Sequence, residues 1–139
     1  MPLLLGIIAE RNALHIIEDS AECIGGTYDG KKAGSFDIGC FSFYPVKHIT
    51  TGEGGAVLTN NSDLDGKVRR LQTHGMIKNP NLLEKNDGPW YYEMHEVGYN
   101  YRITDFQCAL GSSQLKKLDG FVEKRREIAK NYDKTFENN

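Results

Sequence analysis

A lysine beside a glycine-rich turn is the residue of this sequence best suited to covalent chemistry. Lys47 follows Pro45-Val46 and stands two residues before Ile49, so its neighbours are largely apolar. An apolar setting disfavours the charged ammonium, and the neutral amine is then a nucleophile toward an aldehyde. Lys47 is therefore a candidate for forming a Schiff base with an aldehyde cofactor such as pyridoxal phosphate.

Two further residues could complete a site for that cofactor. Asp19 follows the apolar pair at 16–17 and could keep the pyridinium nitrogen protonated. The hydroxyl of Ser42 could bind the phosphate, and the glycine-rich run at 52–55 allows close backbone approach. The same residues also fit a solvated surface lysine and a helix-capping aspartate. Spacing alone leaves both interpretations open.

Three short strands are predicted to position these residues. The apolar run 13–17, which contains His15, predicts a buried parallel strand with acids at its carboxyl end and a histidine packed in the core. Residues 38–44 are rich in aromatic and β-branched side chains and predict a second strand. Residues 56–59 predict a third. Because the strands alternate with helical segments, the pattern indicates an α/β fold.

The first two predicted helices flank these strands in the sequence. Residues 3–12 have the apolar spacing of an amphipathic helix. Ser62 with Asp65 three residues later has the pattern of a capping box, and the helix is expected to run to about Thr73. The polar segment 78–87 is expected to be a surface loop.

A long helical region is predicted at the end of the chain. Thr104 and Gln107 form a second capping-box pattern. An apolar stripe from 106 to 132 then recurs at helical spacing and predicts a face that packs on a core. Gly120 is the expected point of division into two helices.

Composition excludes several other classes of function. The 139 residues carry a net charge of −2, which gives no general attraction to nucleic acid. No apolar run approaches the roughly 20 residues of a membrane helix. The cysteines at 23, 40 and 108 and the histidines at 74 and 95 lack metal-binding spacing, so no metal site is expected. Reduced thiols in a cytoplasmic protein are the expectation.

Several runs, in the same order, resemble the DegT/DnrJ/StrS nucleotide-sugar aminotransferases, a family of fold-type-I pyridoxal-phosphate enzymes. The resemblance covers nearly the whole chain. The matching runs are Glu18-Asp19-Ser20-Ala21, Gly34-Ser35-Phe36-Asp37-Ile38-Gly39-Cys40-Phe41-Ser42-Phe43-Tyr44-Pro45-Val46-Lys47, Gly52-Glu53-Gly54-Gly55-Ala56-Val57, Gly98-Tyr99-Asn100-Tyr101-Arg102, Gln107-Cys108-Ala109-Leu110-Gly111 and Gln114-Leu115. The run 43–51, together with 74–76, most resembles the branch that aminates UDP-linked deoxy sugars.

The resemblance implies a role for each matching residue around the cofactor. Lys47 matches the lysine that forms the Schiff base and moves the proton. Asp19 matches the acid on the pyridinium nitrogen, and Ser42 matches the hydroxyl on the phosphate. Glu22 stands where the family usually has Gln or His near the phenolic oxygen of the cofactor. A carboxylate beside that anionic oxygen is unfavourable, so Glu22 departs from the pattern.

Three other matches imply contacts with substrate and with a second subunit. Asn100 matches an asparagine that reaches the phosphate of the neighbouring subunit's cofactor, which implies a homodimer. His48 is expected to line the site next to Lys47, and Arg102 to bind an anionic group of the substrate.

The implied fold is part of a larger enzyme. Family members are more than twice as long as this chain. The resemblance implies that residues 1–103 form part of the large, pyridoxal-phosphate-binding domain of an aspartate-aminotransferase-like transferase. Residues 104–139 would then be helices that lead into the C-terminal region.

The implied reaction transfers an amino group from glutamate to a nucleotide-linked keto sugar, in the biosynthesis of sugars for polysaccharides or glycans. One alternative is a related dehydratase, in which histidine replaces the lysine, and the presence of Lys47 argues against it. The other alternative is a chain that is inactive or depends on a partner and has only a binding role.

Overall fold

The computed structural model describes residue 9 and residues 11–137, so the helix expected over 3–12 lies largely outside the described residues. The chain divides into two compact units, which are described separately. The first comprises Met1–Leu58 and Thr104–Asn139, and the second comprises Thr59–Ile103. The assignment of residues 1–103 and 104–139 to separate domains of a larger enzyme stays a prediction.

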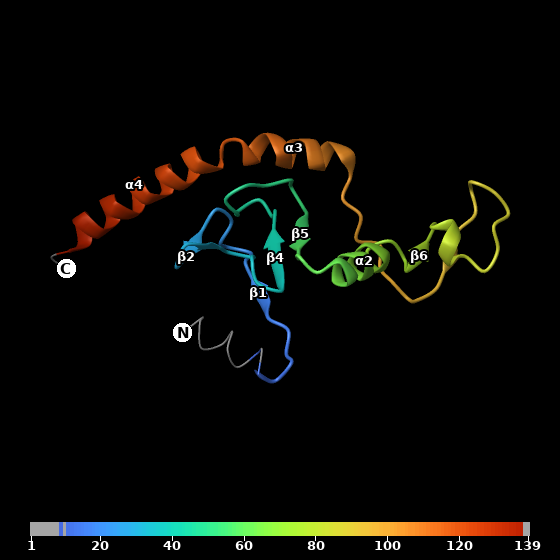
Figure 1. Ribbon diagram of the computed structural model, residues 1–139. Coiled ribbons are helices and arrows are strands. Elements are labelled where there is room, and N and C mark those ends of the chain that lie inside the picture. Colours follow the sequence, from blue (N-terminus) through green and yellow to red (C-terminus); the bar gives the residue numbers. More distant parts are fainter. Residues whose placement is uncertain (1–8, 10, 138–139) are drawn as a thin grey trace. The chain divides into compact units, whose positions relative to one another are not determined.

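The first unit is built on a three-stranded mixed sheet in the order β1-β4-β5 (Figure 1). Strand β1 (Ile17–Asp19) is parallel to β4 (Ile38–Ser42), with Asp19 opposite Cys40. Strand β5 (Gly55–Leu58) is antiparallel to β4. The predicted second and third strands are therefore confirmed to within two residues at each end.

The first predicted strand differs from the structure in position and in burial. It covers only residues 17–19, and Ile17 is 66% exposed. His15 lies outside the strand and is exposed, so the expected core histidine is wrong. Within the described residues β1 pairs with β4 alone. The physical reason for the exposure is that strand side chains project from the faces of the sheet, and the face from which Ile17 projects is left largely uncovered.

The segment between β1 and β4 is held by a close backbone approach of Gly34 and Gly39. The hairpin of β2 (Thr27–Tyr28) and β3 (Lys31–Lys32) is followed by a close approach of two glycines. A Cβ added at Gly39 would lie 2.4 Å from the Cα of Gly34, so neither position has room for a side chain. The Glu18 carboxylate accepts the backbone N–H of Gly34 at 3.0 Å, which fixes this approach.

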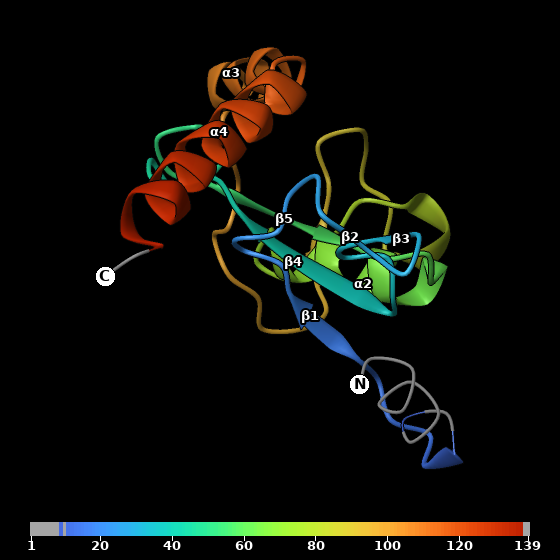
Figure 2. The same cartoon turned by 90° about the vertical axis from the view of Figure 1, so that its left-hand side faces the viewer.

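Two consecutive helices complete the first unit (Figure 2). Helix α3 (Asp105–Leu115) begins with the predicted capping box of Thr104 and Gln107. Helix α4 (Leu118–Phe136) contains Gly120, so the expected break at that glycine is wrong. The break falls at 116–117 instead, where the Lys117 N–H donates to the Gln114 carbonyl at 2.9 Å and closes α3 with a tight turn.

The apolar stripe of these helices does not face a core, as the sequence had predicted. Phe106 is 76% exposed and Tyr132 is 63% exposed. The exception is Leu118, which is 8% exposed. Among the described residues, the buried hydrophobic side chains are those of Ala9, Ile49 and Leu118. Toward its C-terminal end α4 therefore keeps apolar side chains in contact with solvent.

The second unit begins with helix α2 (Ser62–Leu71). Its N-cap is Asn61, whose side-chain oxygen accepts from the backbone N–H of Asp63 at 2.9 Å and of Leu64 at 3.1 Å. The predicted cap at Ser62 is therefore wrong by one residue. The helix ends two residues before the predicted Thr73. An amide oxygen at position 61 already satisfies the first free N–H groups, so the helix needs no cap from Ser62.

A short hairpin and a bridge complete the second unit. Strands β6 (Met76–Ile77) and β7 (Glu93–Met94) pair antiparallel, and the segment between them carries the 3₁₀ helix η1 (Pro80–Leu82). Asn100 pairs with Thr73 in an isolated bridge. In the part of the chain that the structure describes, no helix combines the length and apolar character needed to span a membrane.

Candidate functional site

Asp19 and Ser42 lie at the same end of two neighbouring strands of the sheet. They end β1 and β4, and these strands are parallel, so their carboxyl ends meet at the same edge. The Asp19 carboxylate accepts the Ala21 N–H at 3.2 Å, and the Ser42 hydroxyl oxygen accepts the Tyr44 N–H at 3.3 Å. Both side chains are therefore oriented by the turn that follows their own strand.

Lys47 lies in the connection between β4 and β5, residues 43–54. The Lys47 N–H donates to the Tyr44 carbonyl at 3.0 Å, which makes a tight turn around the lysine. The Phe43 carbonyl accepts both the Thr51 N–H and the Thr50 hydroxyl at 3.0 Å, which closes the turn. Ile49 is 3% exposed and Thr51 is 4% exposed. The turn is thus anchored by buried side chains on the carboxyl side of Lys47.

The amine of Lys47 forms an ion pair with Glu22 across 25 residues of sequence. The Lys47 side chain is 17% exposed, whereas that of Glu22 is 65% exposed. The hydrogen bond from Lys47 lowers the pKa of Glu22. The positive charges of Lys47, His48 and Arg125 add to this effect, and desolvation partly opposes it. Glu22 is therefore held as a carboxylate against the lysine that the sequence singles out.

His48 brings an unsatisfied polar atom to the same turn. Its Nδ1 is buried, and it has no hydrogen-bond partner among the described residues. Buried polar atoms in folded proteins are normally paired, so an unpaired ring nitrogen next to Lys47 is a position where a ligand can bind.

The remaining predicted site residues, Asn100 and Arg102, belong to the second unit. Both are exposed. The bridge between Asn100 and Thr73 is flanked by backbone hydrogen bonds from Tyr101 to Gln72 and from His74 to Tyr99, both 2.9 Å. Their backbone is thereby fixed within that unit.

Two residues of the helices contact the lysine turn and were missed by sequence reasoning. The Arg125 guanidinium donates to the Lys47 carbonyl at 3.3 Å. The Gln107 amide donates to the Glu53 carbonyl at 3.0 Å and to the Thr51 carbonyl at 3.5 Å. The sequence gave Gln107 a capping role, and no local pattern singled out Arg125. No spacing pattern could show a contact over 78 residues.

The residues of the first unit fit pyridoxal phosphate. A largely covered amine, a carboxylate and a hydroxyl lie on one sheet edge or in the turn that follows it. The unpaired Nδ1 of His48 adds a buried polar atom without a protein partner among the described residues. An aldehyde, a pyridinium nitrogen and a phosphate are the groups that this donor set would bind.

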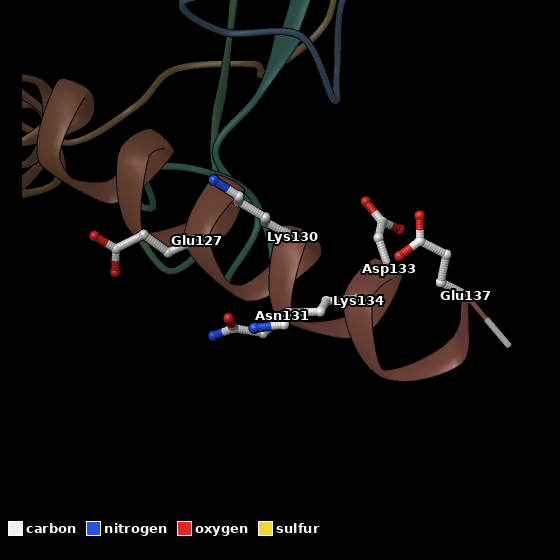
Figure 3. Close-up of a pocket in the computed structure, with 6 residues that line it drawn as sticks. All are labelled: Glu127, Lys130, Asn131, Asp133, Lys134 and Glu137. Atoms are coloured by element: carbon white, nitrogen blue, oxygen red, sulfur yellow. The ribbon is translucent and has the colours of Figure 1, made fainter.

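One hollow elsewhere on the surface lies along α4. It is lined by residues of that helix and its C-terminal end: Glu127, Lys130, Asn131, Asp133, Lys134 and Glu137. Figure 3 shows all six side chains projecting from one helix, so no second element closes the hollow. In the described part of the chain, no group of three His, Cys, Asp or Glu side chains could hold a metal ion.

Comparison with known proteins identifies the family. The UDP-4-amino-4,6-dideoxy-N-acetyl-beta-L-altrosamine transaminase of Campylobacter jejuni is 47% identical over 133 residues, which cover 95% of this chain and 33% of that protein. The solved structure of Helicobacter pylori PseC, an aminotransferase involved in the biosynthesis of pseudoaminic acid, matches with a TM-score of 0.82 and 39% identity. That match covers 95% of this chain and 34% of PseC.

A third match comes from Streptococcus pneumoniae. The putative sugar aminotransferase Spr1654, in its PMP form, has a TM-score of 0.78 and 32% identity, and the match covers 88% of this chain and 32% of that one. The chain therefore spans about a third of the length of these relatives. The fold class predicted from the sequence, an α/β part of such a transferase, is confirmed.

The family model for DegT/DnrJ/EryC1/StrS aminotransferases matches residues 4–139, nearly the whole chain. Enzymes of this family depend on pyridoxal phosphate, in agreement with the donor set around Lys47. The sequence motifs, the mixed sheet with its lysine turn and these matches lead to one conclusion: the chain belongs to the DegT/DnrJ/EryC1/StrS aminotransferase family.

Proposed function

We propose that this chain is the lysine-bearing part of a fold-type-I aminotransferase that moves an amino group from glutamate to a nucleotide-linked keto sugar. The sugar would serve the biosynthesis of polysaccharides or glycans in the cytoplasm. The observation that carries the proposal is the position of Lys47, in the turn that leaves the sheet edge where Asp19 and Ser42 lie. The family match across this region supports it.

Three residues would hold the cofactor. When bound, pyridoxal phosphate supplies an aldehyde carbon and an electron-withdrawing ring. The Lys47 Nζ provides the covalent attachment and later holds and moves the proton of the reacting carbon. The Asp19 carboxylate keeps a proton on the ring nitrogen, because a nearby negative charge favours the charged pyridinium. The Ser42 hydroxyl donates to the phosphate.

Binding of the cofactor would change the contacts of Glu22 and His48. The Lys47 amine is paired with Glu22, so the lysine must leave this carboxylate to become a nucleophile. The unpaired Nδ1 of His48 is a candidate contact for the substrate or the cofactor.

Two residues of the second unit would contact the neighbouring subunit and the substrate. We propose that Asn100 reaches the cofactor phosphate of the neighbouring subunit, so the working form is a homodimer. Arg102 would bind an anionic group of the substrate. The support is the family motif at 98–102, whose backbone is fixed by the bridge to Thr73.

Reductive trapping tests the proposal directly. The purified chain is mixed with pyridoxal phosphate, reduced with borohydride, digested and analysed by mass spectrometry, with Lys47→Ala as the control. In the unaltered chain we expect the label on Lys47. In Lys47→Ala this label should disappear, and the exposed lysines at 31 and 32 should carry no more label than they do in the unaltered chain. A label spread evenly over the surface lysines would contradict the proposed role of Lys47.

A further inference from the structure

We propose that Arg125 of α4 is a positioning residue for Lys47, which fixes the backbone of the lysine turn and places a positive charge beside Glu22. This inference rests on the function proposed for Lys47. It assigns to the helical region a direct part in forming the reactive site.

The first observation is the contact itself. The Arg125 Nη2 donates to the Lys47 carbonyl oxygen at 3.3 Å, from a helix that begins 71 positions after the lysine in the sequence. A hydrogen bond to the main chain of the lysine restricts the turn without occupying the amine. Arg125 can therefore act on Lys47 without contacting the Nζ that would bind the cofactor.

The second observation is that α4 also packs on the segment that carries Glu22. Leu118, the first residue of α4, is buried. A Cβ added at Gly25 would lie 3.1 Å from the Leu118 Cδ2, so the helix start lies directly against this segment. One helix thus contacts both the turn of Lys47 and the chain near its partner carboxylate.

The third observation concerns charge. The hydrogen bond from Lys47 is the main cause that lowers the pKa of Glu22, and the charge of Arg125 is a smaller cause in the same direction. Removing the guanidinium removes one of these attractions and leaves the desolvation of Glu22 in place. The charge of Arg125 therefore favours the ionised carboxylate that Lys47 contacts.

The neighbouring basic residues of α4 do not share this arrangement. Lys124 pairs with Glu127 at 2.7 Å, and Arg126 pairs with Glu123 at 3.5 Å, both within the helix. Arg126 is therefore a matched control for Arg125, since it has the same side chain on the same helix but an intrahelical partner.

The test compares Arg125→Gln, Arg125→Lys and Arg126→Gln with the unaltered 139-residue chain. The first readout is the NMR titration of the Glu22 side-chain carboxyl carbon, which requires no cofactor. We expect Arg125→Gln to move the midpoint of the Glu22 titration to higher pH. Arg125→Lys should keep it near that of the unaltered chain, because the charge remains, and Arg126→Gln should leave it unchanged.

The second readout is the rate of borohydride-trapped pyridoxal phosphate on Lys47. Loss of one hydrogen bond to the turn should lower this rate about fivefold in Arg125→Gln. Arg126→Gln should label like the unaltered chain, and equal helical circular dichroism should show that all variants are folded alike.

Two results would overturn the inference. One is a Glu22 midpoint in Arg125→Gln equal to that of the unaltered chain, and the other is an equal effect of Arg126→Gln. Failure of the proposed function gives a different result, because Lys47 would then stay unlabelled even in the unaltered chain. The Glu22 titration decides the inference in either case.

Discussion

At the scale of single residues, the pair of Lys47 and Glu22 is the feature with most consequence for chemistry. The lysine is largely covered, and its carboxylate partner is exposed. The pKa of Glu22 is lowered chiefly by the hydrogen bond from Lys47. The pair therefore persists as the pH falls below the ordinary pKa of a glutamate, and it separates only when the pH passes through the lowered value.

We expect Glu22→Gln to preserve or tighten the binding of pyridoxal phosphate. The family resemblance implies that position 22 lies near the anionic phenolic oxygen of the cofactor. An amide there removes the negative charge by which Glu22 departs from the family pattern. The dissociation constant, measured from the absorbance of the bound cofactor, checks this. Glu137→Gln, at the exposed end of α4, is the control. A clear loss of affinity in Glu22→Gln, without a loss in the control, would contradict this prediction.

His48 supports a second prediction at this scale. Its buried Nδ1 has no partner in the described structure, and a buried polar atom without a partner costs roughly 1–3 kcal/mol. We expect His48→Leu to leave the free energy of unfolding unchanged or to raise it, while it weakens the trapping of cofactor or the binding of substrate. Urea unfolding and the trapping assay measure the two effects. A large loss of stability would show that the Nδ1 of His48 has a hydrogen-bond partner in the folded chain.

At the scale of elements, two helical glycines differ in what an added side chain would meet: solvent at one position and the lysine turn at the other. A Cβ at Gly120 of α4 would meet no atom within 4 Å, whereas at Gly111 of α3 it would lie 2.9 Å from the Cγ2 of Thr51. Thr51 is buried and its carbonyl accepts from Gln107, so it has little freedom to move.

Gly120→Ala should therefore stabilise the chain by roughly 0.5–1 kcal/mol, which is the usual gain from alanine over glycine in a helix. Gly111→Ala should gain less or lose stability, and it should also reduce trapping at Lys47 because the lysine turn must shift. Urea unfolding of both variants measures the difference. Equal stabilisation by the two alanines would refute the close contact of α3 with the turn.

One carboxylate, that of Glu93, accepts several hydrogen bonds from the segment between β6 and β7. Glu93 accepts from the Tyr91 hydroxyl at 3.0 Å and from the backbone N–H of Glu84 at 2.9 Å and of Lys85 at 3.1 Å. It also lies 2.7 Å from the His95 Nε2. These contacts, led by the bond to His95, lower the pKa of Glu93 to about 2, from 4.5.

The segment between β6 and β7 should therefore become less ordered as the pH falls. A lowered pKa means that the stabilisation is complete above pH 4.5 and is lost as the pH falls toward 2. The only tryptophan, Trp90, lies in this segment, so its fluorescence should change in that interval. In Glu93→Gln the change should be largely absent, and Glu84→Gln is the control. An unaltered pH profile in Glu93→Gln would contradict this role.

At the scale of the whole molecule, the exposed apolar surface is the dominant feature. Large apolar side chains are exposed in each unit, including Phe106 at 76% in the first and Val97 at 86% in the second. Exposed apolar side chains in this number favour association with other apolar surface, because association removes them from water. We expect the 139-residue chain to self-associate, with a sedimentation coefficient that rises with concentration. A monomer over the whole accessible range would contradict the expectation.

The sequence predicted the parts of the fold that depend on local interactions. Strands β4 and β5 and the capping box at Thr104 are formed by neighbouring residues, and they were found to within two residues. The burial of Ile17 and Phe106 was predicted wrongly, because an apolar pattern shows which side chains favour a core but not whether another layer covers them. The contacts of Arg125 and Gln107 with the lysine turn join distant segments, and no local pattern contains them.

The antiparallel pairing of β4 and β5 also sets an order of events in time. The two strands are joined by residues 43–54 alone, so the turn that carries Lys47 closes a short loop and can form early in folding. The contact from Arg125 joins residues 78 positions apart, and closing this longer loop costs more chain entropy. During refolding the lysine turn would thus take shape first. It would acquire its full rigidity only when the last helix docks, so competence to capture the cofactor would lag behind the formation of the hairpin.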